Sequence, residues 1–382
     1  MAGHIQRRGK RNWRLKWELP RDPRTGKRVT RYKTFSGSKK EAEIELTRIL
    51  ASLRTGGYID PHKMSVAEHL ENWLEKVSRP KHSARTYERH QEIVRQRLIP
   101  AFGTALLSEL HPLHIQSAYA DWMKGGRLDG TGGLSAQTVL LFHKTLYRAF
   151  DYAVKWRLLV RNPCRDVVRP KPAEVEYTIL NEEQLLTLLK YAEGKPAFIP
   201  ILIAATTGLR LGEVLGLKWA DIDFEKASLT VNRAVEASRE YGLRFKPPKS
   251  KSSRRTIALP SVTVEALQLH WISQKESRLK LGPKYKDHDL VCPNKFGSIA
   301  DPKNFGNRHY RPLIRKASVP YVKFHELRHT HLTLLLVGNV HPKIAQAQAG
   351  HSSIMITMDT YSHVTPEMQR VAANLMDDII RR

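Results

Sequence analysis

The sequence predicts a multidomain α+β protein with a small β-sheet and one helix at the start, a helical middle and a mainly α C-terminal part that contains a small β-sheet. Three patterns predict this fold class. Apolar residues alternate near the start, recur at helical spacing through the middle, and form two strand-like runs in the second half. The 382 residues are enough for two or three domains with at least one sizeable core.

The first 58 residues are expected to form a small basic sheet backed by one helix. NWRLKWEL, residues 12–19, alternates apolar with charged side chains and predicts a half-buried strand, and VTRYKTF, residues 29–35, predicts a second strand. The sequence SKKE at residues 38–41 is a capping box and predicts the start of the helix. Because the first 40 residues contain 14 Lys and Arg but only two acidic residues, we expect this sheet to bind a nucleic acid.

The middle segment, residues 63–167, has the periodicity of an all-helical domain. A second capping box at Ser65 opens its first helix, and Ser135 precedes a long helix near its end. The next residues, VRPKPAEVE at 168–176, contain two prolines and no periodicity, which is typical of an interdomain linker. The apolar residues expected to form the helical core are Leu70, Trp73, Leu74, Val77, Tyr87, Ile93, Val94, Leu98, Val139, Phe142, Leu146, Ala149 and Ala153.

The last segment, residues 175–382, is expected to be mainly helical. A helix is capped near Asn181, and the long apolar run FIPILIAATTGLRLGEVLGL follows it. Two strand-like runs come next, SLTVNRAV and RRTIALP, and they predict a small sheet. The basic sequence RFKPPKSKSS is predicted to form the turn between them.

The overall charge indicates a polyanionic partner. The chain has 64 Lys and Arg against 37 Asp and Glu, a formal charge of +27 and a pI of about 10.1, so DNA or RNA is the first candidate. No apolar run is long enough to span a membrane, and the N-terminus lacks the apolar part of a signal peptide. The two widely separated cysteines indicate a reducing compartment, so we expect a cytoplasmic protein without disulfides or a cysteine zinc site.

One short motif allows two interpretations. HELRH, residues 325–329, matches the H-E-x-x-H pattern of zinc proteases, which need a third ligand further along the chain. After Glu326 the next acidic residue is Asp359, and the third histidine of the extended pattern is absent. We therefore expect no metal site. The alternative is that these side chains hold a phosphodiester, because arginine binds phosphate through two parallel hydrogen bonds.

The residue types that phosphodiester cleavage requires occur in this half of the chain in order. They comprise cations for the non-bridging oxygens, a proton donor for the leaving oxygen and a nucleophile. The order Arg, Lys, His-x-x-Arg, Gly-His, Tyr resembles that of the tyrosine recombinase (phage integrase) family. The basic N-terminal segment resembles the arm-binding domain of lambda-type integrases. The matching residues are Arg210, Lys249 or Lys251, His325, Arg328, His351 and Tyr361.

The resemblance implies a mechanism without a metal or cofactor. Tyr361 is expected to attack the scissile phosphate, forming a 3′-phosphotyrosyl bond and freeing a 5′-hydroxyl. Arg210 and Arg328 are expected to neutralise charge on the non-bridging oxygens, where His351 adds a hydrogen bond.

Two proton transfers complete that scheme. His325 is expected to help accept the tyrosine proton, and a lysine to protonate the leaving 5′ oxygen. Lys249 fits the expected hairpin turn slightly better than Lys251, and both remain open. Independently of the resemblance, Glu213 lies three residues after Arg210 and is expected to pair with it and orient it.

The resemblance also implies a division of labour along the chain. Residues 1–58 correspond to an arm-type DNA-binding domain with a three-stranded sheet and a helix, residues 63–167 to a SAM-like core-binding domain, and residues 175–382 to the catalytic domain. The expected partners are double-stranded DNA at core and arm attachment sites, further copies in a homotetramer, and accessory DNA-bending and excision proteins. A type IB topoisomerase and an inactive DNA-binding relative are the alternatives.

Overall fold

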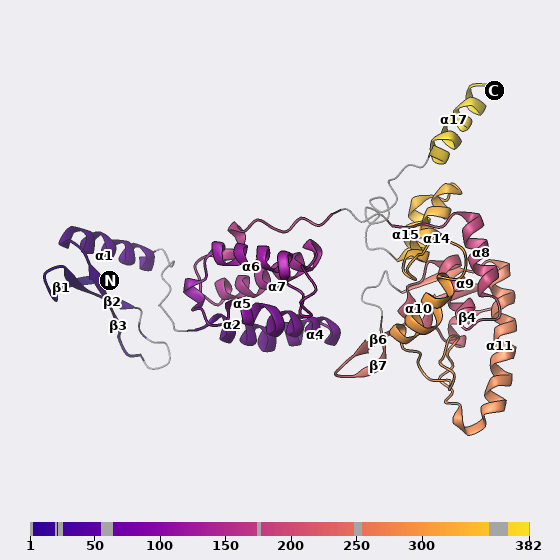
Figure 1. Ribbon diagram of the computed structural model, residues 1–382, viewed down its shortest axis with the longest axis horizontal. Helices are drawn as coiled ribbons and strands as arrows, with labels where there is room; N and C mark the ends of the chain where they lie inside the picture. Colours follow the sequence, from indigo (N-terminus) through magenta and orange to yellow (C-terminus); the bar gives the residue numbers. More distant parts are fainter. Residues whose placement is uncertain are drawn as a thin grey trace. The chain divides into compact units, whose positions relative to one another are not determined.

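The chain divides into two compact units, Met1–Ala173 and Glu174–Arg382 (Figure 1). They are seen in a computed structural model that describes residues 3–19, 21, 26–54, 64–173, 177–247, 254–350 and 366–381. In the part of the chain so described, no helix is long and apolar enough to cross a membrane.

The first unit begins with a three-stranded antiparallel sheet of order β1-β2-β3 and one helix. The predicted strand at 12–19 is confirmed, since Leu15 and Trp17 are buried against the helix. The capping box is also present. The hydroxyl oxygen of Ser38 accepts a bond from the backbone nitrogen of Glu41 at 3.2 Å, and the carboxylate of Glu41 accepts one from the backbone nitrogen of Ser38 at 2.7 Å. The elements are β1 (Gly3–Arg7), β2 (Asn12–Leu19), β3 (Val29–Ser36) and α1 (Lys39–Arg54).

The rest of the first unit is helical around a separate core. Every apolar residue predicted for this core is buried in it, and the capping residues Ser65 and Ser135 both bind the backbone of the turn they precede. The elements are α2 (Val66–Trp73), η1 (Leu74–Ser78), α3 (Arg79–Lys81), α4 (Ala84–Ile93), η2 (Val94–Leu98), α5 (Ile99–Phe102), η3 (Leu107–Glu109), α6 (Pro112–Gly125), α7 (Ala136–Lys155) and η4 (Pro163–Asp166).

The second unit is mainly helical, as expected, and is built around α9. This helix is apolar on all sides, and it packs against α8, α10, α11 and α14. Asn181 caps the helix before it, accepting a bond from the backbone of Gln184 at 2.8 Å as predicted. The helices are α8 (Glu182–Ala192), α9 (Phe198–Thr207), α10 (Leu211–Leu215), η5 (Trp219–Asp221), α11 (Ser261–Leu281), η7 (Gly282–Lys284), α12 (Pro302–Phe305), η8 (Gly306–Tyr310), α13 (Arg311–Ile314), α14 (Glu326–Val337), α15 (Pro342–Ala349) and α17 (Pro366–Ile380).

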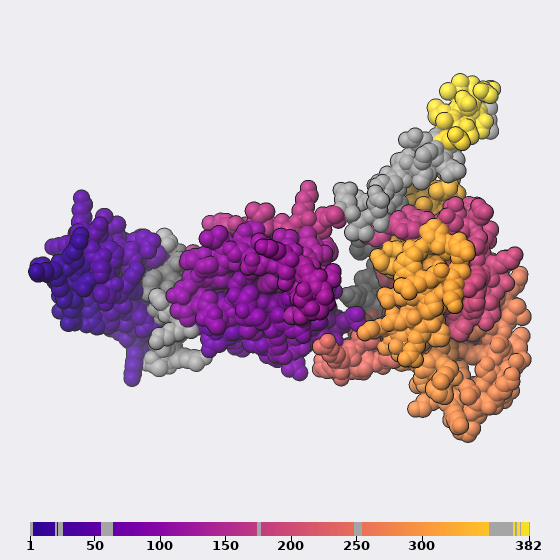
Figure 2. Space-filling model, viewed as in Figure 1, coloured from indigo at the N-terminus to yellow at the C-terminus, as the bar shows by residue number. Residues whose placement is uncertain are grey.

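Two small sheets accompany these helices, and one of them corrects the sequence prediction. The two predicted runs pair over Ser228–Val231 and Arg255–Ala258, in a sheet of order β4-β5-β8, whereas the last two residues of the first run, Ala234 and Val235, belong to β6. The chain between them, however, forms a hairpin, β6 with β7, that projects from the body of the second unit (Figures 1 and 2). The prediction that Arg244, Phe245 and Lys246 belong to a turn is therefore wrong, because they pair with β6. The strands are β4 (Ile222–Asp223), β5 (Ser228–Val231), β6 (Ala234–Ser238), β7 (Gly242–Lys246) and β8 (Arg255–Ala258).

Candidate active site

Arg210 lies in a tight turn between α9 and α10. Gly208 ends α9 with a φ of 67°, in the left-handed region that glycine adopts without strain. A Cβ atom at this position would come within 2.8 Å of the ring of His331, so a larger residue would not fit. Arg210 is the N-cap residue of α10, and its side chain is 40% exposed. The glycine turn therefore presents this arginine at the surface of an otherwise buried segment.

Glu213 is a buried carboxylate that joins two arginines. It accepts bonds from the backbone nitrogen of Arg210 at 3.0 Å and from Nη1 of the same residue at 3.1 Å, the ion pair expected from the sequence. Arg255 donates to the same carboxylate from Nη2 at 2.9 Å and from Nη1 at 3.4 Å. Burial raises the pKa of Glu213, but the hydrogen bonds and charges of Arg255 and then Arg210 outweigh burial and hold this pKa below its ordinary value. Glu213 is therefore ionised at neutral pH.

Arg328 is buried, with only 2% of its surface exposed. Its Nη1 donates to the carbonyl oxygen of Gly208 at 2.8 Å, and its Nη2 donates to the carbonyl oxygen of Ala349 at 2.6 Å. One guanidinium thus ties the turn that carries Arg210 to the end of α15. The planar fork of an arginine suits two acceptors held at a fixed separation.

His325 is the exposed N-cap residue of α14. Its ring meets that of His329 edge-on with 5.2 Å between centroids, and His329 stacks on Tyr177 at 4.4 Å. Partial loss of hydration, followed by the positive charges of Arg328 and Arg210, lowers the pKa of His325. The imidazole is therefore neutral at neutral pH and able to accept a proton.

The other residues of the HELRH segment have structural partners. Glu326 accepts a bond from the backbone nitrogen of Lys323 at 2.6 Å and so caps the first turn of α14. His331, two residues beyond the segment, is buried between a carbonyl of α9 at 2.9 Å and the side-chain oxygen of Gln348 at 3.1 Å. Within the described ranges, no three His, Cys, Asp or Glu side chains are grouped so that they could hold a metal ion.

Of the predicted site residues, the structure brings four together: Arg210, Glu213, His325 and Arg328. The others fall outside the described ranges, and only their neighbours are placed. The two lysines lie in the sequence between β7 and β8, while the glycine-histidine pair begins at Gly350, which ends α15 with a left-handed φ of 64°. The predicted residues outside the described ranges are Lys249, Lys251, His351 and Tyr361.

Arg255 belongs to this cluster and was not among the predicted residues. It is the first residue of β8, where the burial alternates so that Arg255 and Ile257 face inward while Thr256 and Ala258 face outward. That alternation is visible in the sequence RRTIAL. A charged side chain at an inward-facing strand position implies a buried ionic partner, and this was the signal available.

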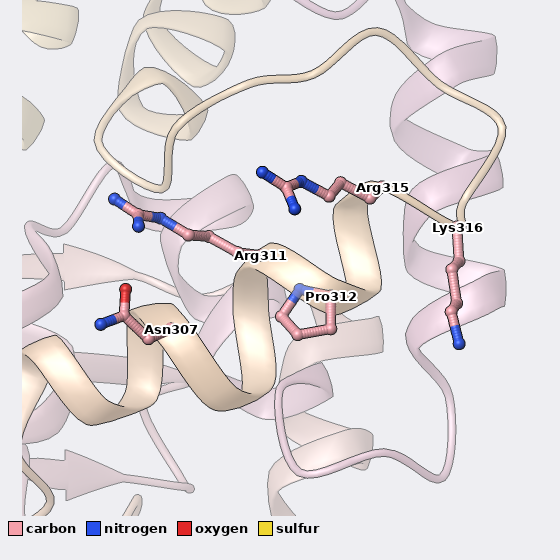
Figure 3. Close-up of a pocket in the computed structure, with 5 residues that line it drawn as sticks. All are labelled: Asn307, Arg311, Pro312, Arg315 and Lys316. Atoms are coloured by element: carbon pink, nitrogen blue, oxygen red, sulfur yellow. The ribbon is translucent and has the colours of Figure 1, made fainter.

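A second group of cations surrounds an open hollow of about 480 Å³ next to α13. Figure 3 shows Arg311 and Arg315 on successive turns with their guanidinium groups extending to the same side, beside Asn307, while Lys316 points away from them. In the described part of the chain no acidic residue forms an ion pair with these three cations. Such a site favours an anion.

The N-terminal sheet has a polar face opposite its helix. Two rows of side chains cross the three strands there, and the guanidinium of Arg14 lies 4.1 Å from the ring centre of Tyr32, which is 50% exposed. A flat array of basic, amide, hydroxyl and aromatic groups fits a nucleic-acid surface. The rows are His4, Lys16 and Tyr32, and Gln6, Arg14 and Thr34.

The chain matches two family models. The model described as the phage integrase family matches residues 178–368, and the model described as the phage integrase N-terminal SAM-like domain matches residues 65–123. A tyrosine recombinase XerC-like protein of Caldanaerobacter subterraneus is 30% identical over 97% of this chain and 97% of its own length. An integrase of Streptomyces ambofaciens is 28% identical over 98% of this chain and 95% of its own length.

Solved structures share the fold. An integrase of transposon Tn1549 in complex with a circular intermediate DNA aligns with a TM-score of 0.67 and 21% identity, covering 82% of this chain and 99% of that one. A lambda integrase tetramer bound to a Holliday junction aligns with a TM-score of 0.58 and 18% identity, covering 93% of this chain and 94% of that one. The chain therefore belongs to the phage integrase family, and it is a tyrosine recombinase, an enzyme that breaks and rejoins DNA.

Proposed function

We propose that this recombinase integrates or excises a mobile element by way of a 3′-phosphotyrosyl bond on Tyr361. The phenolic oxygen attacks phosphorus, the bond from phosphorus to the 5′ oxygen breaks, and the DNA strand is left with a free 5′-hydroxyl. Attack by a 5′-hydroxyl of another strand reverses the step. Because one phosphodiester replaces another at each stage, rejoining needs no nucleotide energy source.

The observation that best supports this proposal is the joint position of Arg210, Arg328 and His325. The bond to Glu213 occupies Nη1 of Arg210, and the half-exposed remainder of that guanidinium is available to a phosphate. Arg328 adds a second positive charge, fixed by its bonds to the carbonyl oxygens of Ala349 and of Gly208, two residues before Arg210. Two preorganised cations stabilise the extra negative charge of the pentacoordinate transition state more than that of the bound phosphodiester.

Proton transfer is assigned to His325 and to one of two lysines. His325 is neutral because of its lowered pKa and accepts the proton of the Tyr361 phenol. Lys249 or Lys251, both of which precede β8 in the sequence, donates a proton to the leaving 5′ oxygen, and His351 donates a hydrogen bond to a non-bridging oxygen. Both lysines remain candidates for the acid.

The test is a duplex with a nick near the cleavage site, which traps the covalent adduct because the short 5′ fragment diffuses away. The wild-type chain should form an adduct, and Tyr361→Phe should bind the duplex but form none. No adduct with the wild-type chain would indicate an inactive DNA-binding relative. Exchange of flanks between two marked duplexes then separates a recombinase from a type IB topoisomerase, which relaxes DNA without pairing two sites.

We further propose that the polar face of the N-terminal sheet reads arm-type sites, with residues 1–58 as the arm-binding domain, 63–167 as the core-binding domain and 175–382 as the catalytic domain. Support comes from the two neighbouring rows of side chains that contain Arg14 and Tyr32. A two- or three-stranded sheet can enter the major groove and place alternate side chains on base edges.

The assembly we propose is a homotetramer on double-stranded DNA, assisted by DNA-bending and excision proteins in the cytoplasm of a bacterial host, on the nucleoid. The lambda integrase of similar fold has been solved as a tetramer on a Holliday junction, which supports this. The hollow around Arg311 and Arg315 supplies a further site for the DNA backbone, because its neighbouring cations suit successive phosphates.

A further inference from the structure

Arg255 makes more polar contacts with the predicted catalytic segments than any role in strand pairing requires. Its side chain is 6% exposed. Two of its nitrogens bind the Glu213 carboxylate at 2.9 and 3.4 Å, and its Nε donates to the carbonyl oxygen of Gln348 at 2.6 Å. All three bonds leave β8 and end on α10 or α15.

The partners of Arg255 connect it to three parts of the active site. Glu213 holds both the backbone and the guanidinium of Arg210. Gln348 lies in the last turn of α15, shortly before Gly350 and the sequence position of His351. The residue itself opens β8, four positions after Lys251 in the sequence. The guanidinium of Arg255 is therefore bonded to the carboxylate that holds Arg210 and to the helix that precedes His351 in the sequence. Its own strand follows the segment that contains the two candidate lysines.

We propose that Arg255 is a positioning residue for DNA cleavage, which holds Arg210 in place through Glu213 and fixes the end of α15 relative to β8. The proposal rests on the function proposed above. Arginine is suited to this role because its rigid fork can bind a carboxylate with two nitrogens and a carbonyl with the third, whereas lysine offers one point charge. Burying such a pair costs solvation energy, which its geometry must offset, so its placement beside the reacting groups is consistent with a functional constraint.

The same unit contains a matched control. Arg233 forms an ion pair with Asp221, whose side chain is 4% exposed and also bonds Asn232 at 2.8 Å. This pair is as buried on its acidic side as the Glu213 pair, and it includes none of the predicted catalytic residues. Its partners lie around η5 and β5, apart from a long bond of 3.5 Å from Arg233 to the carbonyl oxygen of Gly216 at the C-terminal end of α10. Arg233→Gln therefore reports what loss of a buried ion pair does to stability alone.

The experiment measures single-turnover cleavage of the nicked duplex by the full chain at saturating protein, together with duplex affinity and thermal unfolding. Arg255→Gln and Arg255→Lys should each slow cleavage about 100-fold, because a shift of about 1 Å in a positioned group can cost that much. Affinity should change less than about threefold. Arg233→Gln should cleave at the wild-type rate even if it unfolds at a lower temperature.

Two further readouts separate positioning from general support of the fold. If Arg255 acts through Glu213, the double variant Arg255→Gln/Glu213→Gln should be no slower than the slower single variant, since both break one linkage. Arg255→Gln should also raise the pKa of Glu213, because the cation that lowers it is removed. As the pH is lowered, the cleavage rate of the variant should therefore begin to fall at a higher pH than that of the wild-type chain.

The outcomes distinguish this inference from the function on which it rests. Lack of any adduct with the wild-type chain contradicts the proposed function. An active wild-type chain with wild-type cleavage rates in Arg255→Gln overturns only the positioning role. Equal slowing by Arg233→Gln would show that Arg255 supports the fold and not the site, and fully multiplicative effects in the double variant would overturn its action through Glu213.

Discussion

Arg328 and Gly208 are 120 positions apart in the sequence, yet Nη1 of Arg328 donates a hydrogen bond to the carbonyl oxygen of Gly208 over 2.8 Å. The second bond, to Ala349 over 2.6 Å, makes Arg328 a cross-link between the turn before α10 and the end of α15. The residue whose charge is proposed to stabilise the transition state therefore also holds two backbone segments, one that carries Arg210 and one that precedes His351 in the sequence.

Replacing Arg328 should therefore affect both stability and cleavage. In Arg328→Met the two carbonyls lose their donor in the interior, at a cost of about 1–3 kcal/mol each in the free energy of unfolding. Cleavage of the nicked duplex should fall below detection. The control is Arg97→Met, which breaks an arginine bond to the carbonyl of Gly126 in the first unit and should leave catalysis intact at temperatures where the chain is folded. Adduct formation at the normal rate in Arg328→Met would exclude its catalytic role.

The pKa of His325 should depend on Arg210. The Arg210 charge is one of the causes that lower this pKa, so Arg210→Gln should raise it, and the imidazole should become protonated at a higher pH. Because a protonated imidazole cannot accept the phenol proton, the acid side of the cleavage profile should move to higher pH in the variant. Titration of ¹³C-labelled histidine by NMR measures the shift directly. Arg315→Gln, which removes a cation that is not among these causes, should leave the titration unchanged; a similar shift there would mean the effect is not specific.

The hollow beside α13 should contribute to DNA affinity and not to chemistry. Arg311→Ala/Arg315→Ala should weaken binding of a core duplex and reduce the slope of log affinity against log salt by about 0.9 for each phosphate that is no longer neutralised. The cleavage rate at saturating protein should stay within about threefold. Arg278→Ala/Lys280→Ala, on the exposed end of α11, is the charge-matched control. An unchanged salt slope in the first variant would show that this surface does not face DNA.

Removal of residues 1–58 should separate arm binding from cleavage. The truncated chain should lose affinity for arm sequences and recombine poorly, since the basic face around Arg14 and Tyr32 is gone, and its salt dependence should flatten. Adduct formation on a short core duplex should persist, because the predicted catalytic residues all lie beyond residue 200. Substitution of Arg14 by Ala in the full chain tests the same face without a deletion. Loss of core cleavage by a folded truncated chain would assign the segment to the catalytic assembly.

Local patterns in the sequence were enough to predict much of the fold. Capping boxes at Ser38, Ser65 and Asn181 depend on contacts within four residues, and apolar spacing depends only on helix or strand geometry. β1 was not located, because its five residues are largely exposed and show no alternation. The β6–β7 hairpin was missed for a related reason, since its basic residues resemble a turn until their pairing partners are known.

The residue types and order of the candidate site were also present in the sequence, and they indicated the family before any geometry was known. What the tertiary structure decided is how those residues are held. Nothing in the order of residues shows that Arg255 and Arg210 share the carboxylate of Glu213, or that Arg328 joins Gly208 to Ala349. These bonds cross 21 to 120 positions, apart from the local Arg210 pair, and they form only after α9, α14 and β8 have packed. Burial then makes each unpaired charge or carbonyl costly, and that cost selects one arrangement of partners.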